Sequence, residues 1–183
     1  MKVLSIQVGK PKTIQYQGKP VTTGIFKDPV SGPVMLRTLN LDGDGQADLR
    51  VHGGIDKALY AYSYDVYAQW KTLRPQDSFS FGAMGENLSI DSMAEDTISI
   101  GDTYKLGDAI VQVTQPRFPC QKLAIKFNDP SILKQFMKLA RPGVYFRVLQ
   151  EGFINVGDEL QLIDQAKTRL SIIESFKQRG SSD

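Results

Sequence analysis

The chain has 183 residues, of which 22 are lysine or arginine and 20 are aspartate or glutamate, so the net charge is only +2. This length favours one domain with a sizeable core, and so small a net charge gives no argument for binding nucleic acid or a membrane surface. No long apolar run predicts a transmembrane helix, and the first residues lack the apolar region of a signal peptide. The single cysteine excludes an internal disulfide, so we expect a cytoplasmic protein without nucleic-acid or membrane partners.

The first part of the chain consists mainly of short strand patterns. Apolar and polar residues alternate over 4–8, which predicts a strand. Two extended runs joined by 17–20 predict a hairpin over 14–25, and 34–36 form another apolar run. A long polar, glycine-rich segment follows over 40–56.

Two helices are predicted in the body of the chain. Ser63 can cap a helix over 64–73. The apolar face of this helix would carry Val66, Trp70 and Leu73. A second helix is predicted over 131–139, with Pro130 in its first turn.

Gly-Asp pairs separate apolar runs in the second half of the chain, at 101–102, 107–108 and 157–158. Short strands joined by such turns favour a barrel or a sandwich over alternating βαβ units. We therefore predict a mainly β domain over 1–163 that contains a few short helices.

The last segment, 164–183, differs in character and is predicted to form a helical tail. Ser171 and Glu174 have the spacing of a capping box, and a helix is expected over 168–177. Its apolar stripe would consist of Leu170, Ile173 and Phe176. Such a stripe needs a cover, so the helix either packs on the domain or is buried against a second copy, in a homodimer.

Cys120 follows a predicted strand over 110–114 and a loop that contains Pro116 and Pro119. Because proline fixes φ and removes a donor, the strand is not expected to continue through this loop, and a helical pattern resumes near 122–127. Arg117 and Lys122 lie nearby in sequence and would favour the thiolate form, which can bind a metal or attack an electrophile. The alternative is that this lone cysteine is a small buried apolar residue.

The polar segment 42–54 has two interpretations. Its acidic start resembles a calcium-binding loop, but Ala47 and Gly53 occupy the positions that need the turn glycine and the bidentate carboxylate, so this interpretation fails. The second interpretation is a site for a phosphate or another acidic ligand. Its predicted residues are Arg50, His52, Gly53, Gly54 and Lys57.

A shorter polar segment, Gly85-Glu86-Asn87-Leu88-Ser89, lies between apolar runs. On its own it is typical of a turn. Glu86 and Asn87 could equally orient the basic groups of the site.

Three motifs together carry a resemblance to a known family. They are Val51-His52-Gly53-Gly54, Gly85-Glu86-Asn87-Leu88 and Gln115-Pro116-Arg117-Phe118-Pro119-Cys120. In this order and at these separations, over about residues 25–163, they closely resemble the MOSC domain. That domain occurs at the C-terminus of molybdenum cofactor sulfurases and as free-standing bacterial proteins, and the match is closest to the bacterial members linked to hydroxylaminopurine resistance.

The resemblance implies a MOSC-type β-barrel with a cleft for the molybdenum cofactor, in which Cys120 binds the metal. It also implies reduction of N-hydroxylated small molecules, such as hydroxylated purine bases, with electrons from a partner redox protein. Cys120 and His52 would be the catalytic residues. The cofactor would be bound by Arg50, His52, Gly53, Gly54, Lys57, Glu86, Asn87, Arg117 and Lys122. Pyridoxal phosphate is not expected, because the sulfurases bind it in a separate domain. Of the family's three-helix C-terminal extension, the tail would correspond to the first helix alone.

Three functional hypotheses follow from these residues. The first is a molybdenum-dependent reductase of N-hydroxylated compounds. The second is a carrier that binds the cofactor, or sulfur on Cys120, and passes it on without catalysis. The third is a cysteine hydrolase that pairs Cys120 with His52, which is the weakest because no third residue is evident to orient the base.

Overall fold

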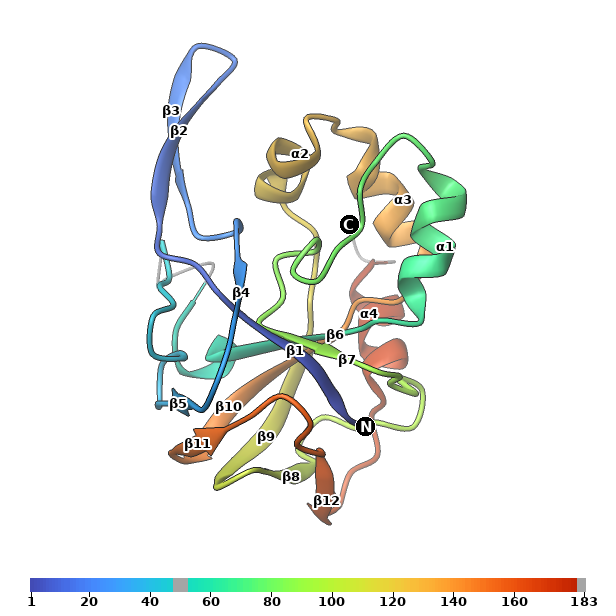
Figure 1. Cartoon of the computed structure of the whole chain (residues 1–183). Helices are drawn as coiled ribbons and strands as arrows, with labels where there is room; N and C mark the ends of the chain where they lie inside the picture. The colour runs from blue at the N-terminus through green and yellow to red at the C-terminus, as the bar shows by residue number, and fades with distance from the viewer. Residues whose placement is uncertain (48–52, 181–183) are drawn as a thin grey trace.

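The structure is a computed structural model that describes residues 1–47 and 53–180. Its main feature is a sheet of eight strands that is covered by helices on one side (Figure 1). These strands are β1 (Val3–Val8), β4 (Asp28–Val30), β6 (Leu59–Ser63), β7 (Leu88–Ile90), β8 (Thr103–Leu106), β9 (Ala109–Pro116), β10 (Val144–Gln150) and β12 (Gln161–Asp164). The predicted mainly β fold is confirmed.

The strand order in this sheet is β12-β8-β9-β10-β6-β7-β1-β4, and only β6 and β7 run parallel. Strands β12 and β4 lie at opposite ends of the order, and the described residues show no pairing between them. The sheet is therefore not closed by backbone hydrogen bonds, and the predicted barrel is not confirmed.

Two smaller sheets complete the β structure. The hairpin of β2 (Lys12–Tyr16) and β3 (Lys19–Thr23) has a two-residue turn, Gln17-Gly18, in which both residues have positive φ. This conformation matches the twist of paired strands, so the predicted hairpin is confirmed with a shorter turn than expected. The second sheet pairs β5 (Val34–Leu36) with β11 (Gly152–Ile154).

Four α-helices are described, together with the short 3-10 helix η1 (Ile55–Lys57). They are α1 (Val66–Leu73), α2 (Gln121–Phe127), α3 (Ser131–Leu139) and α4 (Ile172–Gly180). The prediction for α3 is confirmed, but α1 begins two residues later than predicted. Ser63 does not cap α1, because its hydroxyl donates to Asp65 Oδ1 at 2.6 Å. Leu73 is 50% exposed and does not belong to the buried face.

The core has two parts, and strand β6 contributes to both. Leu59 and Ala61 point to one side of β6 and pack among the strands, whereas Tyr60 and Tyr62 point to the other side and pack under the helices. Side chains along a strand alternate between the two faces of the sheet, and in β6 both faces are buried. No helix in the described ranges is long and apolar enough to cross a membrane.

The predicted Gly-Asp turns are confirmed. Gly101, Gly107 and Gly157 all have positive φ, which glycine adopts without a steric penalty. The aspartate that follows can fix the turn: Asp102 Oδ2 accepts a hydrogen bond from the Ser99 amide at 2.8 Å.

Helix α4 packs against the rest of its own chain. Its capping box is confirmed, because the Ser171 amide donates to Glu174 Oε2 at 2.9 Å and the Glu174 amide donates to Ser171 Oγ at 3.1 Å. The predicted stripe is out of register: Ile172 and Phe176 are buried, while Ile173 is only partly buried. The chain therefore covers the apolar face that led us to consider a dimer.

Candidate functional site

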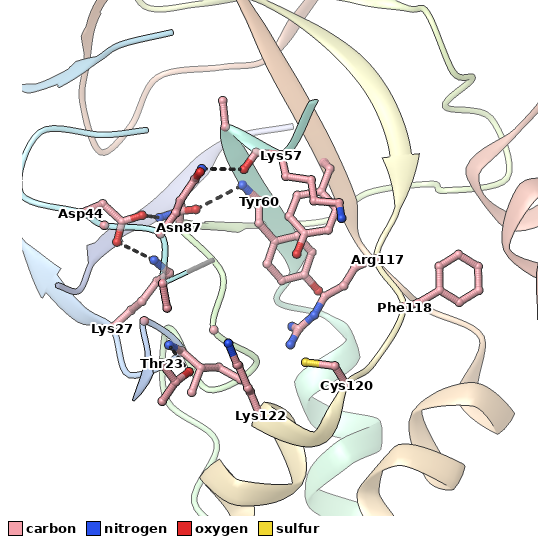
Figure 2. A pocket seen from close by; sticks show the side chains of 18 residues that line it. Thr23, Lys27, Asp44, Lys57, Tyr60, Asn87, Arg117, Phe118, Cys120 and Lys122 are labelled. Atoms are coloured by element: carbon pink, nitrogen blue, oxygen red, sulfur yellow. Dashed lines mark hydrogen bonds and ion pairs between the residues drawn. The ribbon is translucent and has the colours of Figure 1, made fainter. Parts of the chain in front are cut away.

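A pocket opens between the base of the β2–β3 hairpin, the end of β9 and the start of α2 (Figure 2). Segments far apart in sequence form its wall, from Thr23 in β3 to Tyr145 in β10. Five of the predicted site residues that contribute side chains line it: Lys57, Asn87, Arg117, Cys120 and Lys122.

Local backbone geometry places Cys120 at the pocket. Strand β9 extends two residues beyond the predicted 110–114 and ends at Pro116, which pairs with Val144, so the expectation that the loop would not continue the strand is confirmed. A proline is tolerated at the end of a strand, where the ladder needs no donor from it. The chain then leaves the sheet, and Cys120, with extended φ and ψ of −132° and 171°, becomes the N-cap residue of α2. Its half-buried thiol faces the Arg117 guanidinium (Figure 2).

Arg117 is 6% exposed, and its contacts hold it beside the thiol. Its Nη1 donates to the Met84 carbonyl oxygen, and its guanidinium lies 4.8 Å from the centroid of the Tyr60 ring. Burial opposes the charge, but the neighbouring Tyr60, Tyr145 and Cys120 raise the pKa of Arg117 above its ordinary value. A fixed positive charge therefore lies next to the sulfur.

Glu86 organises the loop that holds Arg117 and does not line the pocket. Its carboxylate is fully buried and accepts hydrogen bonds from the amides of Gly82 and Met84 at 2.8 and 3.0 Å, and from the hydroxyls of Ser89 at 2.8 Å and Tyr67. The Met84 carbonyl in the same loop accepts the hydrogen bond from Arg117. Glu86 thus acts on the site through the backbone, as a residue behind the lining.

Asn87 connects three parts of the pocket wall. Its Oδ1 accepts from the Tyr60 amide at 3.2 Å, and its Nδ2 donates to Asp44 Oδ2 at 2.9 Å and to the Gln7 carbonyl at 3.2 Å. The preceding Gly85 has positive φ, and a Cβ atom there would lie 2.7 Å from the Ile25 side chain. Residues 85–87 therefore serve the site by close packing and by hydrogen bonding.

Sequence reasoning missed a buried ion pair in the wall. Lys27 Nζ lies 2.5 Å from Asp44 Oδ1, and the two side chains are 8% and 4% exposed. Burial lowers the pKa of Lys27, although Asp44 acts in the opposite direction. The sequence signal was Asp44 itself, in the segment whose calcium-loop interpretation was rejected. Its partner lies 17 residues away, in the loop between β3 and β4.

Lys126 lies behind this wall on α2. Its Nζ donates to the carbonyl oxygens of Gly82 at 2.5 Å and of Ile25 at 3.2 Å, so it fastens two lining segments to the helix. Burial lowers the pKa of Lys126 to about 8, and the nearby Arg117 and Lys27 contribute in the same direction. These two hydrogen bonds offset the cost of burying the amine.

The predicted anion segment is only partly described. Arg50 and His52, and with them the expected proximity of His52 to Cys120, lie outside the described residues. Gly54 donates its amide to Gln46 Oε1 at 2.8 Å, and a Cβ atom on Gly53 would lie 2.2 Å from that same oxygen. The close backbone approach at these glycines is therefore to the Gln46 side chain, while Lys57 lines the pocket.

The charge of the described lining is strongly positive. It contains four cationic side chains, Lys27, Lys57, Arg117 and Lys122, against one carboxylate, Asp44. Among the residues that the structure covers, no three His, Cys, Asp or Glu side chains cluster as a metal site would require. An anionic ligand in this pocket would therefore meet several cations.

Comparison with known proteins now identifies the family. A model of the MOSC domain matches residues 48–161, so the chain belongs to the MOSC domain family. The resemblance stated from the three motifs is confirmed.

Several individual proteins are similar to the chain. It is 42% identical to the uncharacterized protein YflK of Bacillus subtilis over 93% of the chain and 76% of that protein. It is 36% identical to the protein YiiM of Escherichia coli over 81% of the chain, although only 66% of YiiM is covered. A protein of Gibberella moniliformis named "Reductase" is 34% identical over 93% of the chain, which spans only 31% of that longer protein.

Solved structures agree with this assignment. The crystal structure of YiiM from Geobacillus stearothermophilus is 38% identical, has a TM-score of 0.80, and matches 97% of the chain and 83% of its own. The structure of YiiM from E. coli is 28% identical, with a TM-score of 0.75 over 96% of the chain and 76% of its own.

Proposed function

We propose that this protein binds the molybdenum cofactor through Cys120 and reduces N-hydroxylated small molecules, such as N-hydroxylated purine bases. The observation that carries the proposal is a thiol that faces a buried arginine in a cationic pocket. The overall reaction consumes two electrons and two protons, so that R–NHOH yields R–NH2 and H2O. The similar YiiM proteins and a relative named "Reductase" support this direction.

The residues present fit the cofactor. A thiolate is a soft ligand that suits molybdenum, and the phosphate of a pterin cofactor needs cationic or backbone N–H partners. Arg117, Lys57 and Lys122 line the described part of the pocket, where they would meet such an anion. When bound, the molybdenum centre would supply the two-electron chemistry and an open position for an N–OH oxygen.

The residues of the chain itself would bind the cofactor, orient it and hold the pocket wall around it. Cys120 would hold the metal, and the fixed Arg117 guanidinium would place a positive charge beside the sulfur. The Lys27–Asp44 pair and Asn87 would fix the opposite wall, since their mutual hydrogen bonds leave that wall little freedom. Electrons would come from a partner redox protein.

The test compares wild-type protein with Cys120→Ser, both purified from a host that makes the cofactor. We expect stoichiometric molybdenum and pterin in the wild type, loss of molybdenum in the variant, and reduction of a hydroxylamine by the wild type with a chemical electron donor. Gln121→Ala is the matched control, because it changes the exposed neighbour in the same helix start without touching the thiol. Equal molybdenum in wild type and Cys120→Ser would refute the assignment of the ligand.

The same experiment separates catalysis from transport. A carrier would contain the cofactor, or a persulfide on Cys120, yet would not turn over a hydroxylamine with any electron donor. Molybdenum bound without turnover would therefore favour the carrier.

A further inference from the structure

We propose that one face of the β2–β3 hairpin, together with Lys122 across the pocket mouth, is the docking surface for an acidic electron-carrier protein. The inference rests on the proposed function, because a reduction of this kind needs two electrons from outside. With one cysteine, the chain cannot supply the several thiolates of an iron–sulfur relay of its own. The donor must consequently approach the pocket mouth.

The hairpin is a projecting element that the core does not require. It pairs with no other sheet in the part of the chain that the structure covers, and it extends away from the body at the same end of the molecule as α2 (Figure 1). Neither core cluster contains any of the residues 12–22. An isolated hairpin is marginally stable in water, so a partner that covers one of its faces would stabilise it.

Side-chain alternation identifies the face. Residues 12, 14 and 16 of β2 are paired with 23, 21 and 19 of β3, and these six share one side of the hairpin. Thr23 on this side is buried and lines the pocket, so the face continues directly from the pocket wall. The back face carries the exposed Thr13, Gln15, Pro20 and Thr22.

The composition of the front face fits a transient redox interface. Ile14, Tyr16 and Val21 are only partly buried and form an apolar centre, with the exposed Lys12 and Lys19 at its ends. Weak electron-transfer complexes have small interfaces, and charged rims steer their encounter. An apolar centre with a lysine rim matches such a contact.

Charge complementarity selects the partner. From Gly9 to Lys27 the chain contains Lys10, Lys12, Lys19 and Lys27 and no acidic residue, although cations and anions are nearly balanced over the whole chain. Lys27 is neutralised by Asp44, but Lys122 adds a cation on the α2 side of the mouth. A carrier with an acidic patch around its redox group would meet positive charge on both sides of the pocket.

The test uses two acidic carriers as probes, an FMN-loaded flavodoxin and a plant-type [2Fe–2S] ferredoxin, with Lys12→Glu/Lys19→Glu as the variant. We expect wild-type protein to bind at least one probe at low ionic strength, and the double variant to raise its Kd about tenfold. The difference should shrink in 0.5 M NaCl, since salt screens exposed charges. Gln15→Glu on the back face and Lys105→Glu on β8 are the matched controls and should bind like the wild type.

Turnover then separates this inference from the proposed function. The double variant should reduce a hydroxylamine as fast as wild type with dithionite-reduced methyl viologen, but more slowly with the protein donor. No turnover with the chemical donor would refute the proposed function, while probe binding to the hairpin would still stand. Absence of binding to both probes, equal binding by the double variant, or hairpin-dependent binding of a DNA oligonucleotide or of a second copy in its place would overturn the docking surface.

Discussion

Phe176→Ala should destabilise the protein strongly, because Phe176 fastens α4 to the loop that carries Cys120. The side chain is 2% exposed, and its ring stacks on Phe118 with centroids 4.9 Å apart and meets Phe136 edge-on at 6.4 Å. Truncating a buried phenylalanine to alanine costs about 3–5 kcal/mol, and aromatic pairs contribute roughly 0.5–1.5 kcal/mol beyond burial. We therefore expect the free energy of unfolding to fall by about 3–5 kcal/mol.

The assay is urea unfolding followed by fluorescence of the single tryptophan, Trp70, which packs in the same cluster as Phe176. Phe153→Ala is the matched control, because Phe153 is 50% exposed and should lose less than about 1 kcal/mol. An unchanged slope with a lower midpoint would report a loss of global stability. A loss in Phe176→Ala no larger than in Phe153→Ala would refute the packing argument.

The remaining predictions concern groups behind and within the pocket. Glu86→Gln turns an amide NH2 toward groups that donate to the carboxylate, so we expect a loss of about 2–4 kcal/mol in urea unfolding; a loss below 1 kcal/mol would contradict the assigned contacts. The pKa of Lys126 is lowered from 10.5 to about 8, mainly by burial, so the unfolded chain binds more protons than the folded one between these values. The free energy of unfolding of the wild type, measured relative to that of Lys126→Met, should therefore rise from about pH 8 to 10. If this difference stayed constant or fell with pH, the amine would not be buried. Arg117→Met should slow alkylation of Cys120 by iodoacetamide at pH 7.5 about threefold or more, whereas the exposed Lys138→Met should leave the rate unchanged; equal rates in all three proteins would remove Arg117 from the thiol's surroundings.

Local sequence signals predicted the elements whose structure is decided locally. The Ser171–Glu174 capping box, helix α3 and the positive-φ glycines of the Gly-Asp turns all depend on neighbours within a few residues. The start of α1 was misplaced because the Ser63 hydroxyl bonds to Asp65 and accepts the Met93 amide, and Met93 is 30 residues away. Sheet closure could not be predicted either, since strand pattern gives no strand order.

In the site too, features that depend on neighbours in sequence were predicted and features that depend on distant residues were not. Arg117, Cys120 and Lys122 are close in sequence and were predicted together, and all three line the pocket. The Lys27–Asp44 pair and the support from Lys126 were missed, because their contacts join the loop between β3 and β4, the polar segment and α2. The indirect position of Glu86 was foreseen as one alternative, but only the structure shows that it acts through the Met84 carbonyl.

The strand order also has a consequence for the sequence of folding events. Strands β8, β9, β10 and β12 come from residues 103–164 and are adjacent in the sheet, while β1, β4, β6 and β7 come from the first 90 residues. The β10–β6 pairing joins the two halves within this sheet, and the β5–β11 pairing joins them a second time. The pocket takes lining residues from both halves. A ligand in this pocket can bind only after the halves have joined. The binding free energy of the ligand then opposes separation of the two halves, and it stabilises the contact between them against partial unfolding.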